Sequence, residues 1–229
     1  MSLVAFLPDW VVPVARYMAT EGLKGTGTIA AESVAASAVI GVVLGTLMTL
    51  DSRLLKAAIR LYIEIWRGLP LIVTIFVIFF VLPSAGIRLT AIQAAAVGLS
   101  LWGSAQVAEA TRGAVQSIPR EQHEAAAALG FGWLGRHAFV IVPQALRRLL
   151  PPMVSLLVNV IQNSTLAGLI GGVELLFAAK IQVERLAGPP PAGLAQVHAV
   201  EIYGSLMVAF FVISFPLTRL AAYLEKRLV

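Results

Sequence analysis

The sequence predicts an all-α integral membrane protein with five transmembrane helices and a cytoplasmic helix-turn-helix loop. Hydrophobic residues make up 59% of the chain, charged residues only 13%, and the mean hydropathy is +0.87. Such a composition leaves too little polar surface to cover a soluble globule. The apolar residues also gather in runs near the ~20 residues that a helix needs to cross a bilayer. Lipid is therefore the expected solvent.

Residues 1–28 are expected to form an external segment that lies at the membrane interface. This part contains Pro8, Asp9, Trp10, Pro13 and Arg16. It lacks the charged start, the continuous apolar run and the small-residue cleavage site of a secretory signal. We therefore expect the mature chain to retain it as an interfacial helix.

Five apolar runs are expected to cross the membrane, at residues 29–50, 62–82, 91–111, 149–172 and 199–223. The second run is the least regular, because its uninterrupted apolar part is too short to cross alone. Gly68 and Pro70 predict a break within that span. Three consecutive prolines, 189–191, predict an outer loop between the last two spans.

The basic residues indicate the orientation. With residues 112–148 on the inside, all but five of the 17 Lys and Arg residues are cytoplasmic, the five being Arg16, Lys24, Arg88, Lys180 and Arg185. This is the distribution that the positive-inside rule describes. The N-terminus is expected outside and residues 224–229 form a cytoplasmic tail. The net charge of +5 is then a signal of topology, and nucleic-acid binding is not indicated.

The cytoplasmic loop is predicted to contain two short helices. Ser117 is a possible cap, Pro119 lies in the first turn, and Glu121 and Glu124 lie near the positive end of the helix dipole. Gly130 is expected to end this helix in the left-handed conformation. A second helix over residues 133–142 is expected to stop at Pro143.

Four consecutive alanines, residues 125–128, leave one side of the first loop helix small enough for a partner protein to approach closely. Both ends of the loop adjoin membrane spans, so a partner that presses here can transmit motion to them. The alternative is an amphipathic loop that merely lies on lipid, but charged residues interrupt its surface. The loop therefore predicts coupling and not catalysis.

At these residues the chain resembles the permease subunits of type I ABC importers, whose loop carries Glu-Ala-Ala, three residues, Gly, and a hydrophobic-x-hydrophobic-Pro ending. The matching residues are Glu124, Ala125, Ala126, Gly130, Val140, Val142 and Pro143. More narrowly, the sequence from about Thr26 onward resembles the polar amino-acid branch of these importers. The further matches are Arg67-Gly68-Leu69-Pro70, Ala108-Glu109 with Arg112-Gly113, Ile118-Pro119, and Pro143-Gln144-Ala145.

The resemblance implies a permease domain over residues 29–223 in a bacterial inner or plasma membrane. It also implies three kinds of protein partner: an ABC ATPase dimer on the loops, an extracytoplasmic solute-binding protein that delivers an amino acid, and a second permease copy in a homodimer or heterodimer. The chain has no phosphate-binding loop of the Gly-x-x-x-x-Gly-Lys-Ser/Thr type. ATP hydrolysis is therefore assigned to a separate subunit, and no cofactor is expected here.

Polar residues within the spans are candidates for the translocation pathway, because unpaired polar groups in hydrocarbon are costly. Gln162, Asn163, Ser164 and Thr165 form a polar run in the fourth span. They either line the pathway or make hydrogen bonds between helices. Related permeases usually carry a Lys-Asp pair in place of Gln162 and Asn163, so substrate specificity does not transfer directly.

Glu109 and Arg112 lie three residues apart on one helical face. They form either a local ion pair or part of an inner gate. His123, His137 and His198 have no metal-ligand spacing and are expected at the surface.

Three functions remain open at this point. Alternating access driven by an ATPase is the leading hypothesis. A secondary transporter or channel without an ATPase and a membrane scaffold are the alternatives.

Overall fold

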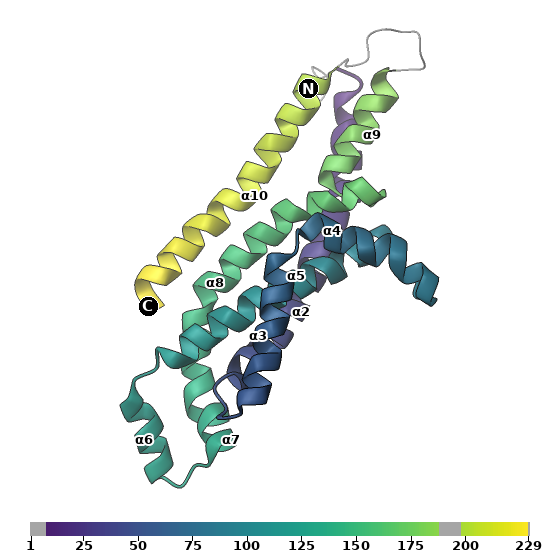
Figure 1. Cartoon of the computed structure of the whole chain (residues 1–229). Helices are drawn as coiled ribbons and strands as arrows, with labels where there is room; N and C mark the ends of the chain where they lie inside the picture. The colour runs from purple at the N-terminus through teal and green to yellow at the C-terminus, as the bar shows by residue number, and fades with distance from the viewer. Residues whose placement is uncertain (1–7, 188–197, 229) are drawn as a thin grey trace.

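The computed structural model describes residues 8–187 and 198–228. These residues fold into helices joined by short turns, with no strand in the described ranges, so the predicted all-α class is confirmed. The molecule is elongated (Figure 1). α1 (Val11–Tyr17) and α9 (Leu175–Ala187) lie at one end, and α6 (Arg120–Ala128) and α7 (Trp133–Arg136) project at the other.

The first helix is longer than the first predicted span. It comprises α1 (Val11–Tyr17), a π turn (Met18–Gly22) and α2 (Leu23–Leu47), and it runs unbroken for 37 residues. From Val11 onward, the described part of the expected interfacial segment is thus helical and continuous with the span that follows it. Its position at the membrane surface stays a prediction.

The predicted break in the second span is confirmed, and it is a sharp change of direction between two separate helices. α3 (Arg53–Gly68) and the helical stretch that starts with α4 (Leu71–Phe76) meet at 99°. Leu69, which precedes Pro70, is extended with φ −78° and ψ 137°. The ring of a proline disfavours the helical conformation in the preceding residue, and this separates the helices. A π turn (Val77–Val81) and a 3₁₀ turn (Leu82–Ala85) extend α4.

α5 (Ala91–Gln116) is the central helix and contacts α2, α3, α4 and α8 (Val142–Asn163). It approaches α2 closely because Gly41 and Gly45 of α2 have no side chain. A methyl group at Gly41 would collide with Val107, and one at Gly45 would collide with Ala108. Many of its buried residues are small: Ala, Gly and Ser. α5 therefore lies within protein and not mainly against lipid.

Three helices in the described ranges are long and apolar enough to cross a membrane, namely Val11–Leu47, Trp133–Ile170 and Ala199–Leu228. The bent pair α3 and α4 makes a fourth candidate. α5 begins at Ala91 as predicted and ends five residues beyond the predicted end at 111. It corresponds to the third predicted span but is not among the helices that meet these criteria, because its many small residues make its composition less apolar.

The last helix, α10 (Ala199–Leu228), returns the chain toward the end from which α6 and α7 project (Figure 1). A 3₁₀ turn (Ser164–Ile170) extends α8, and α10 packs against α8 and α9. Trp10 stacks on His198 at the start of α10, with 4.3 Å between ring centroids. Glu225, near the other end of α10, lines a cavity with Ser117 and Arg148. The prolines predicted to form the outer loop lie outside the described residues.

Candidate functional site

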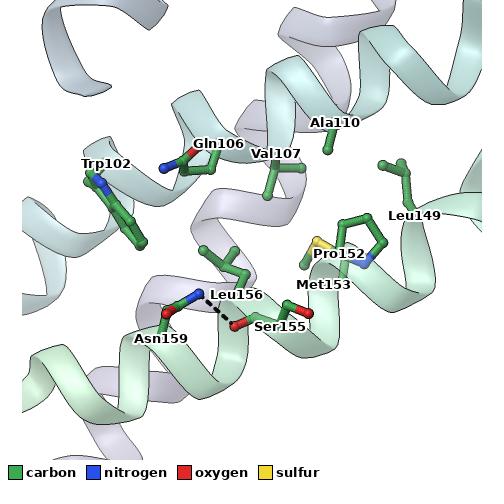
Figure 2. Close-up of a pocket in the computed structure, with 10 residues that line it drawn as sticks. All are labelled: Trp102, Gln106, Val107, Ala110, Leu149, Pro152, Met153, Ser155, Leu156 and Asn159. Carbon is green, nitrogen blue, oxygen red and sulfur yellow. Dashed lines mark hydrogen bonds between the residues drawn. The ribbon is translucent and has the colours of Figure 1, made fainter. Parts of the chain in front are cut away.

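Two features of the structure are candidates for function: a coupling elbow and a membrane groove. The coupling elbow comprises residues 117–143 and includes α6, α7 and a π turn (His137–Ile141). It projects beyond the ends of the long helices (Figure 1). The membrane groove is the cavity between α5 and α8 (Figure 2).

The elbow begins differently from the prediction, because Ser117 does not cap α6. Ser117 ends α5, where its Oγ donates to the Ala114 carbonyl O at 2.7 Å. Pro119 occupies the cap position of α6 and makes no side-chain cap hydrogen bond. Glu121 lies in the first turn as predicted, and Glu124 forms an exposed ion pair with Arg120 at 2.7 Å.

The predicted helix end at Gly130 is confirmed. Gly130 has φ +85°. Its N–H donates to the Ala127 carbonyl at 2.9 Å, and the Phe131 N–H donates to the Ala126 carbonyl at 3.1 Å. This pair of bonds satisfies the last carbonyls of α6 and requires the left-handed conformation that glycine adopts most readily.

The second helix does not stop at Pro143, and this prediction was wrong. The helical stretch from α7 continues through the π turn into α8, with Pro143 in the first turn of α8. The Val142 N–H donates to the His137 carbonyl, five residues earlier. This wider turn accommodates a ring that lacks an N–H, and the Gln144 Nε2 donates to the Val140 carbonyl at 2.9 Å. The elbow is therefore joined to α8 by one continuous helix.

The outer surface of the elbow is partly apolar. Glu124 and Ala125 are exposed, whereas Ala126 is buried. Leu129, Leu134 and Phe139 are 78%, 74% and 73% exposed. Sequence reasoning missed these three residues, although large apolar side chains in a charged loop were a possible signal. Exposed apolar side chains grouped beside charged ones are typical of a protein interface.

A buried cluster fastens the elbow to the spans. Its members come from the end of α5, the following turn, the π turn and the start of α8: Ala114, Val115, Ile118, Ile141, Ala145 and Leu149. The same spans continue into the walls of the membrane groove. A movement of the elbow is thus expected to move the groove walls with it.

The prediction that all three histidines lie at the surface is wrong for His137. His137 is only 4% exposed and its Nε2 lies 3.1 Å from the Thr49 Oγ1. His123 and His198 are half-buried. Burial is the main cause of the lowered pKa of both His123 and His137.

The membrane groove has a volume of about 350 Å³. Trp102 and Gln106 of α5 and Leu156 and Asn159 of α8 border it (Figure 2). The remaining lining residues are Val107, Ala110, Leu149, Pro152, Met153 and Ser155. The lining residues in the described ranges include no ionisable side chain. The groups that could contact a polar ligand are therefore uncharged side chains and the Trp102 ring.

Polar residues of α8 continue from the groove toward the predicted pathway residues. Ser155, Asn159 and Asn163 recur every four residues and so share one helical face. The Asn159 Nδ2 donates to the Ser155 carbonyl at 3.0 Å, and the Asn163 Nδ2 donates to the Asn159 carbonyl at 2.8 Å.

Gln162, Asn163, Ser164 and Thr165 lie beyond Asn159 and do not line the cavity itself. Ser164 is buried and donates to the Ile161 carbonyl, and Thr165 donates to the Gln162 carbonyl. The hydrogen bonds of Asn163, Ser164 and Thr165 thus stay within their own helix and do not join neighbouring helices.

Glu109 and Arg112 form the local pair that their spacing predicts. The Arg112 Nη2 donates to Glu109 Oε1, its Nε donates to Oε2 at 3.2 Å, and its Nη1 donates to Gln116 Oε1 at 2.6 Å. Both charged side chains are about one-quarter exposed, at 25% and 26%. Neither residue of the pair lines the membrane groove, and in the chain the pair lies between Gln106 and the elbow.

Sequence reasoning missed Glu174, a fully buried carboxylate just before α9. Its two oxygens accept hydrogen bonds from the N–H groups of Leu176 and Phe177, each at 2.8 Å. Thr26 of α2 accepts a further hydrogen bond from the Leu175 N–H at 3.2 Å. Glu174 is therefore the cap of α9, and the Thr26 bond holds the start of α9 beside α2.

Comparison with known proteins tests the resemblance. Residues 38–229 match the family described as the inner membrane component of binding-protein-dependent transport systems. The chain is 30% identical over 211 residues to the "Probable glutamine ABC transporter permease protein GlnM" of Bacillus subtilis, covering 92% of this chain and 93% of the relative. It is 33% identical over 210 residues to the glutamine transport system permease protein GlnP of Escherichia coli, covering 91% of each.

The fold also has a solved counterpart. A crystal structure of an amino acid ABC transporter with histidines superposes with a TM-score of 0.78 at 24% sequence identity, covering 97% of this chain and all of the other. The fold implied by the resemblance is thus confirmed. The chain belongs to the family of inner membrane components of binding-protein-dependent transport systems.

Proposed function

We propose that this chain is the permease subunit of an ATP-driven importer that carries a polar amino acid by alternating access. The observation that carries the proposal is the continuous helical connection between the elbow and the groove. Helix α8 supplies Ser155 and Asn159 to the groove and continues from the elbow without a break. A force applied to the elbow therefore acts directly on a wall of the groove.

The elbow is the proposed docking surface for an ATPase subunit. Glu124, Ala125, Ala126, Gly130 and Pro143 are assigned to coupling. Gly130 and Pro143 shape the elbow, and Ala126 packs its first helix inward. The exposed Leu129, Leu134 and Phe139 supply apolar area that the ATPase covers.

The groove is the proposed cytoplasmic part of the translocation pathway. Gln162, Asn163, Ser164 and Thr165 are assigned to its continuation, and Glu109 with Arg112 to an inner gate. The lining is mostly apolar with the uncharged polar side chains of Gln106, Ser155 and Asn159, and it favours an amino acid with an uncharged polar side chain, because a buried side-chain charge needs a partner of opposite sign. The names of the glutamine permeases above agree with this substrate class.

The proposal requires three partners and one orientation. An ABC ATPase dimer hydrolyses ATP on the cytoplasmic side, an extracytoplasmic solute-binding protein delivers the amino acid, and a second permease copy completes the pathway. The chain itself binds no ATP. It crosses a bacterial inner membrane with its N-terminus outside and its C-terminus in the cytoplasm, and residues 29–223 form the permease domain.

The first experiment is to purify the tagged chain from its native membrane in mild detergent and to identify the co-purifying proteins by mass spectrometry. We expect an ABC ATPase with one permease type or two, which also separates a homodimer from a heterodimer. Leu134→Ser is expected to reduce ATPase recovery. Val200→Ser is the control, because Val200 is 83% exposed in the first turn of α10, a helix that starts at the opposite end of the molecule (Figure 1).

Reconstitution of the purified complex in liposomes then tests transport. Uptake that needs both ATP and the binding protein supports the importer. Reproducible recovery of the chain without an ATPase, together with ATP-independent uptake, would contradict the proposal and support a secondary transporter or channel.

A further inference from the structure

A second cavity adjoins the membrane groove on the side nearer the coupling elbow. This adjoining cavity has a volume of about 420 Å³ and lies between the end of α5, the first half of α8 and the end of α10. Ala110, Pro152 and Ser155, which Figure 2 shows in the groove lining, also line the adjoining cavity. The two spaces are therefore neighbours, and the second has the size of a small-molecule site.

The adjoining cavity is lined by two side chains of opposite charge that do not pair with each other. Arg148 of α8 and Glu225 of α10 both border it, and no ion pair joins either of them to another residue in the described ranges. The Arg148 Nη1 donates to Ser117 O and Oγ, whereas its Nε and Nη2 make no hydrogen bond to a described residue. Arg148 therefore retains N–H groups that can bind a carboxylate.

The groove alone does not match the charges that every free amino acid carries. An amino acid with an uncharged polar side chain still has an α-ammonium group and an α-carboxylate group. The groove lining contains no ionisable side chain within the described ranges, and a charge that enters such a space without a partner is costly. The adjoining cavity supplies one side chain of each sign directly beside the groove.

Contacts within the protein do not account for both charges. Arg148 holds Ser117 through a single nitrogen, which uses only part of the guanidinium. Glu225 lies in the last turn of α10, where Lys226 and Arg227 complement the helix dipole and a carboxylate opposes it. Glu225 thus contributes little to the stability of its own helix. A ligand with a positive group is the partner that its position in the cavity favours.

We propose that the adjoining cavity binds the transported amino acid as it leaves the groove, with Arg148 holding the α-carboxylate and Glu225 the α-ammonium group. The inference rests on the proposed function and extends it. Ser155 borders both spaces, and its hydroxyl can donate to the carboxylate during the passage from one to the other. Because all amino acids share these two groups, the site recognises the class and does not discriminate between side chains.

The test measures equilibrium binding of radiolabelled L-glutamine to the complex of permease and ATPase in nanodiscs, without a solute-binding protein. Glu225→Gln removes the charge but keeps the size of the side chain, and it is expected to weaken glutamine binding about tenfold, which corresponds to about 1.4 kcal/mol. Asp51→Asn is the matched control, because this exposed carboxylate follows α2 and lines neither cavity. Its affinity should equal that of the wild type. Undiminished glutamine binding in Glu225→Gln overturns the inference.

Two analogues of glutamine test the two charges separately. Glutaramate lacks the α-ammonium group and 4-aminobutanamide lacks the α-carboxylate, and each is expected to compete about tenfold more weakly than glutamine. Glu225→Gln should not weaken the binding of glutaramate, because the group that Glu225 contacts is absent from it. Equal losses of affinity for glutaramate and glutamine would mean that Glu225 acts on the fold and not on the ligand, which contradicts the inference.

A lipid headgroup with the same two charges is the competing occupant. Nanodiscs of phosphatidylethanolamine, which carries a phosphate and an ammonium group, are compared with nanodiscs of phosphatidylglycerol, which lacks the ammonium group. We expect equal glutamine affinity in both. Glutamine binding that is lost in phosphatidylethanolamine, together with retention of this lipid that Glu225→Gln abolishes, would assign the cavity to lipid and overturn the inference.

ATP-dependent uptake by the same complex, measured in liposomes with the binding protein, separates this inference from the proposed function. Glu225-dependent glutamine binding without ATP-dependent uptake contradicts the proposed function and leaves the binding site supported. ATP-dependent uptake without Glu225-dependent glutamine binding contradicts the inference and leaves the proposed function supported.

Discussion

Arg148 of α8 donates two hydrogen bonds to Ser117 at the end of α5, one to the backbone O at 2.9 Å and one to Oγ at 2.7 Å. The two residues are separated by 31 positions, and nearly all of the coupling elbow lies between them. The guanidinium therefore closes the base of the elbow and holds the ends of two spans together.

The first prediction concerns this closure. Arg148→Ala is expected to leave ATP hydrolysis intact but to lower substrate import per ATP about fivefold, which corresponds to about 1 kcal/mol of lost interaction at a partly exposed site. The measurement is parallel uptake and phosphate release in liposomes. Arg147→Ala, at the exposed neighbouring position, is the control. Equal losses in the two variants would indicate a general effect of charge.

The second prediction concerns the shape of the elbow. Gly130 has φ +85° with open space around its Cα, so Gly130→Ala strains the backbone without a collision. The expected cost is about 1–2 kcal/mol, observed as faster hydrogen exchange in residues 126–136 and weaker ATPase capture. Gly132 also faces open space, but its φ is −66°, so Gly132→Ala should be nearly neutral. Equal effects at both positions would exclude backbone conformation as the cause.

The third prediction concerns the contact between α2 and α5. A methyl group at Gly41 would meet Val107 and lie 2.8 Å from the Ser104 carbonyl O, and α2 and α5 would have to separate. Gly41→Ala is expected to destabilise the chain by about 1–3 kcal/mol and to lower Tm by several degrees in detergent. Gly27→Ala lies on the same helix but meets nothing within 4 Å, so it should retain the wild-type Tm. An unchanged Tm for Gly41→Ala would contradict the close packing.

Local features could be predicted from the sequence where one residue dominates the backbone. Pro70 was enough to predict the break before α4, and Gly130 was enough to predict the end of α6. Pro143 misled the prediction because a π turn just before it accommodates the ring. The effect of a proline on a helix depends on the hydrogen bonds of the preceding turn, which sequence alone does not specify.

Contacts between distant segments could not be predicted in this way. His137 is buried only because the turn after α2 covers it, and nothing near His137 in the sequence indicates Thr49. The groove residues Gln106 and Asn159 are single polar residues within apolar runs, and the sequence did not distinguish them. Gln162–Thr165 were predicted to line the pathway because they form a continuous polar run. Which polar side chains share a cavity depends on how α5 and α8 are rotated against each other.

The last prediction separates these two sets of polar residues. Asn159 lines the groove, and Asn163 lies one turn beyond it on the same face. If the amide of Asn159 bonds the substrate, Asn159→Leu should raise the KM for uptake about tenfold, because a lost polar contact costs about 1–2 kcal/mol. ATPase capture should be unaffected, since the elbow is distant. A comparable rise in Asn163→Leu would extend the pathway to the residues predicted from the sequence, whereas an unchanged KM in Asn159→Leu would exclude the groove as a substrate site.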